Sequence, residues 1–211
     1  MRRRTTLIAA LGLSALLSAA ACGGSSQPPA ALPAGGAQGT TAARASASPT
    51  ASVAGQLPSD FKVDIEITPT GDATKDGLLS QARALIMAYE QAVSRNNPSD
   101  SLYQSMTSQR ARLNLYSMID AFRQAGRRPS GSERFYQFSA LPQSKVPAAD
   151  VLFCDDSSKV VPVGLKSGKP VGAAATGSAA RTWWDVGFEK SSGGTWNIVY
   201  AATQVGRQSC M

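Results

Sequence analysis

Histidine is absent from the 211 residues. Its absence removes the side chain that most often exchanges protons near neutral pH, and with it any Ser-His or Cys-His nucleophile. The chain also lacks a Cys-x-x-Cys pair, a phosphate-binding loop, a dinucleotide-binding fingerprint and a Gly-x-Ser-x-Gly elbow. We therefore expect no metal and no cofactor, and any catalysis would depend on carboxyl and tyrosine side chains.

Charged and large apolar side chains are nearly missing from residues 22–57, in which Arg44 is the only charged residue. Such a segment buries too little apolar surface to offset the entropy lost on ordering, so it is predicted to be a disordered tether. The chain then divides into a signal peptide at 1–21, the tether at 22–57, and one globular domain at 58–211 that is long enough for a real core.

The start of the chain has the layout of a secretory signal peptide. Three arginines precede an apolar run over residues 7–17, which is too short to cross a membrane comfortably, and small residues follow. The step Ala20-Ala21-Cys22 resembles the lipobox of bacterial lipoproteins, which implies that Cys22 is acylated and holds the domain to membrane lipid on the outer face of the cell membrane. The alternative is cleavage at an Ala-x-Ala site and secretion, with Cys22 incidental.

The net charge of +7 overstates how basic the folded part is, because four of the excess positive charges lie before residue 58. The remaining +3 does not suggest a nucleic-acid partner, which an exported protein would not be expected to meet. A solvated helix face explains the one cluster of basic residues: Arg110, Arg112, Arg123, Arg127 and Arg128.

Only three cysteines are present. If Cys22 is lipidated, Cys154 and Cys210 remain, and an even remainder in an exported protein predicts a disulfide. Closing a loop of this length would stabilise the fold by roughly 4 kcal/mol in the chain-entropy model.

Apolar periodicity divides the domain into helices and strands. Helices are predicted over 74–95, 100–103 and 107–124. Strands are predicted over 60–68, 134–141, 149–153, 159–165 and in the two arms of a hairpin within 181–210. This order predicts an α+β fold in which N-terminal helices pack on one side of a curved antiparallel sheet.

The hairpin carries three tryptophans within fourteen residues. Trp184 is predicted to face inward with Val186 and Phe188, and the return strand is predicted to turn Trp196, Ile198, Tyr200 and Ala202 to one face. Trp183 is out of phase with Trp184. It either belongs to an ordinary core or lines a pocket or a partner surface.

Three short motifs carry a resemblance: Cys154-Asp155-Asp156-Ser157, Gly194 to Ile198 (GTWNI), and Val205 to Cys210 (VGRQSC). With the order of elements, they resemble the nuclear transport factor 2-like cone fold, and more specifically small secreted lipoproteins of high-GC Gram-positive bacteria. The resemblance implies a cavity between sheet and helices. Some members of the fold are isomerases, dehydratases or cyclases with an Asp or His base and Tyr or Asp donors. One departure is Lys159-Val160-Val161, where similar chains often carry Trp.

The carboxyl candidates have alternative interpretations. Asp155 and Asp156 are predicted to cap backbone N–H groups in a turn after Cys154, and on a strand they would point to opposite faces. Asp185 would be the best base if its face turned inward, and otherwise it is a solvent-facing strand residue. The tyrosines that could assist are Tyr89, Tyr116 and Tyr136.

Three functions remain open. The favoured one is a non-catalytic domain that binds a small apolar ligand, through Trp183, Tyr136 and Tyr89, or a protein of the cell envelope. A related one is an interaction module that forms a homodimer through the sheet. The alternative is an isomerase- or cyclase-like enzyme that uses Asp185 or Asp156 with a tyrosine. A binder predicts a purely apolar cavity, a module predicts a filled one, and an enzyme predicts a buried Asp of raised pKa near a Tyr hydroxyl.

Overall fold

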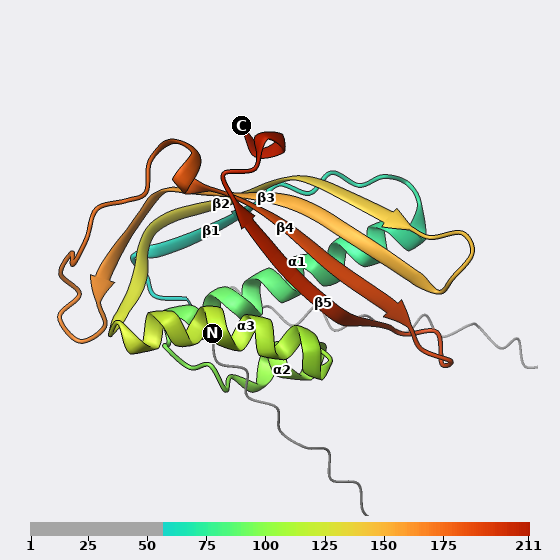
Figure 1. Cartoon of the computed structure of the whole chain (residues 1–211), viewed down its shortest axis with the longest axis horizontal. Helices are drawn as coiled ribbons and strands as arrows, with labels where there is room; N and C mark the ends of the chain where they lie inside the picture. The colour runs from blue at the N-terminus through green and yellow to red at the C-terminus, as the bar shows by residue number, and fades with distance from the viewer. Residues whose placement is uncertain (1–56) are drawn as a thin grey trace, which may run out of the picture. The chain divides into compact units, whose positions relative to one another are not determined.

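The computed structural model describes residues 57–211. The predicted signal peptide, Cys22 and all but the last residue of the predicted tether lie outside the described residues. The described part is a curved five-stranded sheet with α-helices packed on its concave face (Figure 1). None of its helices has the length and apolar character needed to cross a membrane.

The elements follow one another as β1 (Phe61–Ile65), α1 (Ala73–Ser94), α2 (Ser101–Met106), α3 (Gln109–Gln124), β2 (Arg127–Pro142), β3 (Ala148–Gly164), β4 (Arg181–Lys190) and β5 (Trp196–Val205). A short 3₁₀ turn, η2 (Gly177–Ala180), precedes β4, and a second one, η3 (Gln208–Cys210), follows β5.

The sheet is mixed, so the predicted all-antiparallel sheet is wrong at one strand. The strand order is β1-β2-β3-β4-β5, and β1 runs parallel to β2 while the other pairs are antiparallel. The three helices form the connection between β1 and β2, and such a crossover allows the chain to re-enter the sheet in the same direction.

Helix α1 crosses the concave face and brings its last turns to the start of β2. It begins where the Asp72 carboxylate accepts hydrogen bonds from the backbone N–H groups of Thr74 (2.8 Å) and Lys75 (3.0 Å). It ends near Asn96, whose side-chain amide donates to the carbonyl of Arg127 at 2.8 Å. The end of α1 is therefore held at the start of β2. The buried face of α1 includes Leu78, Ala82, Leu85, Ile86, Tyr89 and Val93.

Strands β2 and β3 are longer than the sequence predicts. The predicted strands 149–153 and 159–165 are one strand, β3, so Asp155 and Asp156 lie in mid-strand and the predicted turn after Cys154 is wrong. Irregular register near Glu133 and at Gln137, which has a positive φ of 56°, bends the pair.

The bulge at Gln137 also changes which side chains face inward. Phe135 and Ala140 are buried in the core, and Tyr136 points to the opposite face of the sheet. Regular alternation along the predicted strand 134–141 would put Tyr136, Phe138 and Ala140 on one face, and this is wrong because the extra residue reverses the alternation between Tyr136 and Phe138.

A second bulge interrupts the pairing between β4 and β5, the two arms of the hairpin. Gly187 pairs with Tyr200 and Phe188 pairs with Ile198, so Val199 has no partner across the ladder. The buried residues of β5 are Ile198 and Ala201. The predicted single face from Trp196 to Ala202 is therefore wrong beyond this bulge.

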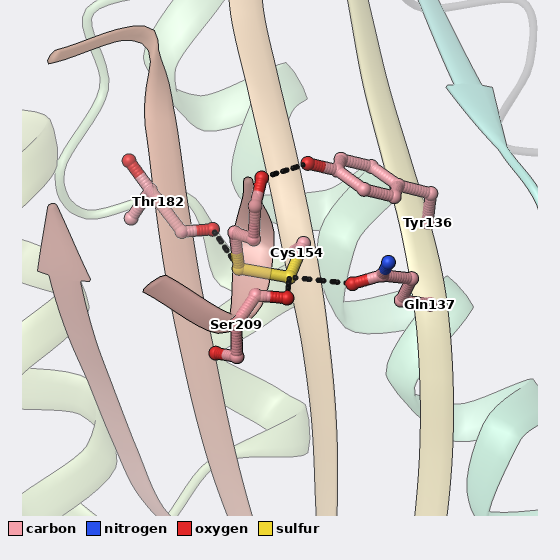
Figure 2. The surroundings of a disulfide bond; sticks show 6 residues. Tyr136, Gln137, Cys154, Thr182 and Ser209 are labelled. Carbon is pink, nitrogen blue, oxygen red and sulfur yellow. Dashed lines mark hydrogen bonds between the residues drawn. A yellow bond between two sulfur atoms is a disulfide. The ribbon is translucent and has the colours of Figure 1, made fainter. Parts of the chain in front are cut away.

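The C-terminal segment folds onto the convex face and is covalently held there (Figure 2). The structure contains the Cys154–Cys210 disulfide, with the two Cα atoms 5.6 Å apart. The Tyr136 hydroxyl donates a hydrogen bond to the carbonyl of Cys210 at 2.7 Å, and the Arg207 guanidinium lies 3.6 Å from the centre of the Trp183 ring. The predicted homodimer through the sheet stays a prediction.

Candidate functional site

A cavity of about 320 Å³ lies between the helices and the concave face of the sheet. Helices α1 and α3, strands β2, β3 and β4, and the loop before β4 all contribute to its wall. Apolar side chains cover much of the wall: Val93, Met118, Phe122, Val160, Pro162, Ala173 and Ala175. The volume lies within the range of small-molecule sites.

Three acidic side chains from three different elements meet in this wall. Glu90 comes from α1, Glu133 from β2 and Asp155 from β3, and they are only 3%, 9% and 7% exposed. Glu133 is hydrogen-bonded to both of the others, with Asp155 donating to Glu133 and Glu133 donating to Glu90. We call this set the carboxyl chain.

Burial keeps the carboxyl chain largely protonated. It raises the pKa of Glu90 to about 8, with a further rise from the nearby charge of Asp155. Burial, followed by the charge of Glu90, raises the pKa of Glu133 well above its ordinary value. Burial, followed by the charge of Glu133, does the same for the pKa of Asp155. Acids that stay protonated near neutral pH can both give and take protons.

Aromatic rings form the floor beside the carboxyl chain. Tyr89 meets Trp184 edge to face at 5.4 Å between ring centres, and Trp184 stacks on Phe153 at 5.6 Å. Burial, followed by the charge of Glu90, raises the pKa of the Tyr89 hydroxyl, so this group stays protonated. These rings fix the position of the polar atoms among them.

Two polar atoms in the cavity wall have no hydrogen-bond partner among the described residues. They are Oδ1 of Asp155 and Nε1 of Trp184, and both are fully buried. Leaving a polar group buried and unpaired costs about 1–3 kcal/mol. Both residues line the cavity, so the Asp155 carboxyl group and the Trp184 indole are the polar groups that a molecule bound there would meet.

The sequence candidate Asp156 lies on the convex face, away from the cavity. Its carboxylate forms an ion pair with Arg181 and accepts a hydrogen bond from the backbone N–H of Ser158 at 2.9 Å. Partial burial raises the pKa of Asp156, but these bonds outweigh it and the net shift is downward. Asp156 is therefore a structural anion in this fold.

Asp185 also lies on the face opposite to Trp184, so it does not reach the cavity. It is half-buried, and desolvation, followed by the charge of Asp150, raises its pKa, while Arg207 partly offsets the rise. The condition under which Asp185 would be the best base, an inward-turned face, is not met.

The remaining candidates divide between the two faces. Tyr89 lines the cavity, whereas Tyr136 and Trp183 contact the C-terminal segment on the convex face. Tyr116 is exposed on α3 and does not line the cavity. Trp184 lies in the core, as its predicted inward face implies, and it is also the tryptophan that lines the cavity.

Glu90 and Glu133 are the residues that sequence reasoning missed. Glu90 follows Ile86 by four residues and precedes Val93 by three, so it stands within the apolar stripe of a helix. Glu133 lies two residues before the buried Phe135 on one strand. In both cases an acidic residue stands where the periodicity calls for an apolar one, and this is the sequence signal that could have identified them.

Within residues 57–211, acidic and cysteine side chains do not gather in any arrangement suited to a metal ion.

No family model and no curated protein matches the sequence. Among solved structures, the chain is similar to a protein from Catenulispora acidiphila at 8% identity and a TM-score of 0.44, over 65% of this chain and 98% of that one. It is similar to a candidate ketosteroid isomerase from Shewanella frigidimarina at 8% identity and a TM-score of 0.32, over 68% and 99%. It is also similar to a candidate polyketide cyclase from Xanthomonas campestris at 13% identity and a TM-score of 0.31, over 59% and 89%.

These similarities are loose, and the chemistry of the site is argued from this chain's own residues. The curved mixed sheet with helices on one face is consistent with a nuclear transport factor 2-like α+β fold.

Proposed function

We propose that the protein acts on a small organic molecule by proton transfer, as an isomerase- or cyclase-type enzyme whose active site is the cavity. The observation that carries the proposal is the buried carboxyl chain in the cavity wall. A purely structural core rarely retains three acids without a partner of opposite charge, because each would be more stable in water.

The hydrogen bonds of the carboxyl chain define a path for a proton. Glu90 stands at the end of the chain, and with its pKa at about 8, about a tenth of Glu90 side chains are ionised at pH 7. When the Asp155 carboxyl takes a proton from the ligand on one oxygen, it passes the proton on its other oxygen to Glu133, and Glu133 passes one to Glu90. The reverse sequence returns a proton to another position of the ligand.

Two donors are placed to stabilise negative charge that develops on the ligand. The Nε1–H of Trp184 has no partner in the fold, and the Tyr89 hydroxyl stays protonated beside the same cavity. Donors held in a dry site stabilise a developing oxyanion without a cost of reorientation. Trp184, Tyr89 and Asp155 thus form the set that contacts the ligand.

The cavity differs from what an apolar-ligand binder and an interaction module each predict. A binder of apolar ligands predicts a purely apolar wall, and this wall contains three carboxyl groups. An interaction module predicts a filled cavity, and about 320 Å³ is open. The cavity therefore favours the enzyme alternative, with Asp155 in place of Asp185 or Asp156.

Solvent deuterium uptake tests the proposal. The full chain would be incubated in D₂O with a panel of small ketones, enones and amino ketones, and carbon-bound deuterium would be measured by mass spectrometry. We expect Asp155→Asn to lower the exchange rate on at least one compound by about 10²–10⁴-fold, the usual range for one acid-base group. Asp185→Asn is the matched control on the convex face. Equal exchange rates in wild type and Asp155→Asn, or no exchange above the rate without protein, would overturn the proposal.

We further propose that the enzyme is a lipoprotein on the outer face of the cell membrane, anchored through Cys22. The Cys154–Cys210 disulfide supports an exported protein, since disulfides persist in oxidising compartments.

A further inference from the structure

We propose that the ligand of the cavity is an organic cation: an ammonium group on a small apolar body, bound by the carboxyl chain. This inference rests on the proposed function, because it names the ligand class of the same site.

The ionisable groups around the cavity favour a cation over an anion. Glu90, Glu133 and Asp155 face it from α1, β2 and β3, and Tyr89 is the further titratable group from α1. Helix α3 contributes Met118 and Phe122, and the loop before β4 contributes alanines. The wall as described thus holds three acids and one basic residue, which stands at the rim.

Neither nearby arginine forms an ion pair with the carboxyl chain that the structure records. Arg127, at the rim, is exposed, and its guanidinium lies 5.3 Å from the centre of the Phe122 ring. Arg181 forms its ion pair with Asp156 on the convex side, and its charge reaches Asp155 only as a lesser influence. A buried carboxylate needs a cation beside it to be stable, and a bound ammonium group would supply one.

Two polar side chains of the wall give the ligand its polar pattern. Asp155 is 7% exposed and lines the cavity, and its carboxyl group is an acceptor for an ammonium N–H. Trp184 is 5% exposed, and its free Nε1–H is a donor that matches an oxygen on the same ligand. A charge-assisted bond to a carboxylate is about twice as strong as a neutral one.

The rest of the wall suits the apolar body of such a ligand. The rings of Trp184 and Tyr89 can lie against a cation or an apolar group, and Val93, Val160 and Pro162 add apolar surface. A cavity of about 320 Å³ stands at the lower end of ligand-site volumes. The ligand is therefore expected to be a small amine.

Binding should release a proton, which gives the proposal a distinctive signature. The ammonium ion takes the place of one proton held by the carboxyl chain, so the balanced event is exchange of an organic cation for H⁺. Affinity should then rise with pH between 6 and 8, by up to about tenfold per unit when one proton is released.

Isothermal titration calorimetry on the full chain tests this with 2-phenylethylamine and its neutral counterpart 2-phenylethanol. Titrations in phosphate and MOPS buffers at pH 7, where Glu90 is still about nine-tenths protonated, count the protons released. We expect the amine to bind at least about tenfold more tightly than the alcohol, with close to one proton released. Glu133→Gln and Asp155→Asn should each remove that preference, and Asp185→Asn should keep it.

The outcomes separate this inference from the proposed function. If the alcohol binds as tightly as the amine, or the amine binds without proton release, the cation assignment is wrong and the proton-transfer site stands. If neither compound binds, the cation assignment is also wrong, and deuterium uptake then decides the proposed function by itself. If circular dichroism shows that either variant fails to fold, the wild type still decides the cation assignment, through the number of protons released on amine binding and the pH dependence of amine affinity.

Discussion

Replacing Glu90 by glutamine should make the free energy of unfolding less dependent on pH. Burial raises the pKa of Glu90 from its ordinary value of 4.5 to about 8 in the folded protein. Between these values the native state holds a proton that the unfolded chain has released. Stability falls as pH rises wherever the native state binds more protons, so Glu90 should destabilise the wild type progressively from about pH 4.5 to about pH 8.

The size of this effect follows from the shift in pKa. One pKa unit corresponds to about 1.4 kcal/mol, so the change from 4.5 to about 8 costs about 5 kcal/mol by pH 8. Glutamine carries no ionisable proton and keeps a polar group that can bond to Glu133. The free energy of unfolding of Glu90→Gln should still fall somewhat as pH rises, because burial also raises the pKa of Glu133 and of Asp155.

Urea denaturation followed by tryptophan fluorescence measures how the stability of the wild type and of Glu90→Gln depends on pH. The measurements would be made at several pH values between 5 and 8 at constant ionic strength. Near pH 5 the variant and the wild type should differ little, and by pH 8 the variant should be the more stable by several kcal/mol. Glu189→Gln is the control, since Glu189 is an exposed carboxyl at the end of β4. Parallel stability curves for Glu90→Gln and wild type would refute the assignment of Glu90 as a buried acid.

Three further predictions concern other parts of the chain. Replacing Cys154 and Cys210 together by serine should lower the free energy of unfolding by about 4 kcal/mol, because the bond spans 56 residues; an unchanged denaturation midpoint would contradict this. Gly131→Ala should destabilise the fold by about 2 kcal/mol or more, because φ is 101° and the new Cβ would lie 2.2 Å from a carbonyl oxygen of β3. Gly77→Ala is the control, since its new Cβ would stand in open space on α1, and it should stabilise the fold by about 0.5–1 kcal/mol. Equal effects of the two substitutions in a denaturation assay would count against the structure. Cys22→Ser should move the protein from the membrane fraction to the soluble fraction, and continued sedimentation with membranes would exclude the lipid anchor.

The α+β arrangement could be predicted because its elements have regular periodicity. The stripe from Leu78 to Val93 recurs every three or four residues, and Trp184, Val186 and Phe188 alternate cleanly. The disulfide followed from counting cysteines. These features depend on local pattern and composition, which a single sequence contains.

The bulges could not be predicted, and they decide which side chains reach the cavity. One extra residue at Gln137 turns Tyr136 to the convex face, and one at Val199 divides the inward face of β5. An irregularity of one residue leaves almost no trace in composition, yet it reverses the alternation beyond it.

The carboxyl chain could not be predicted because its members come from three distant elements. Glu90, Glu133 and Asp155 each stand at an inward position of a helix or strand, where an acid is costly unless something compensates it. Separately, each resembles a solvated surface residue. Only the packing of α1 on β2 and β3 shows that they meet.

Infrared spectroscopy of the carboxyl groups tests the central claim most directly, which is that acids in the cavity hold protons at neutral pH. At pH 7 exposed carboxyl groups are ionised, so a remaining protonated-carboxyl band reports buried acids. We predict such a band in the wild type at pH 7, weakened in Asp155→Asn and absent when Glu90→Gln, Glu133→Gln and Asp155→Asn are combined. A wild-type spectrum at pH 7 with no protonated-carboxyl band would contradict the account.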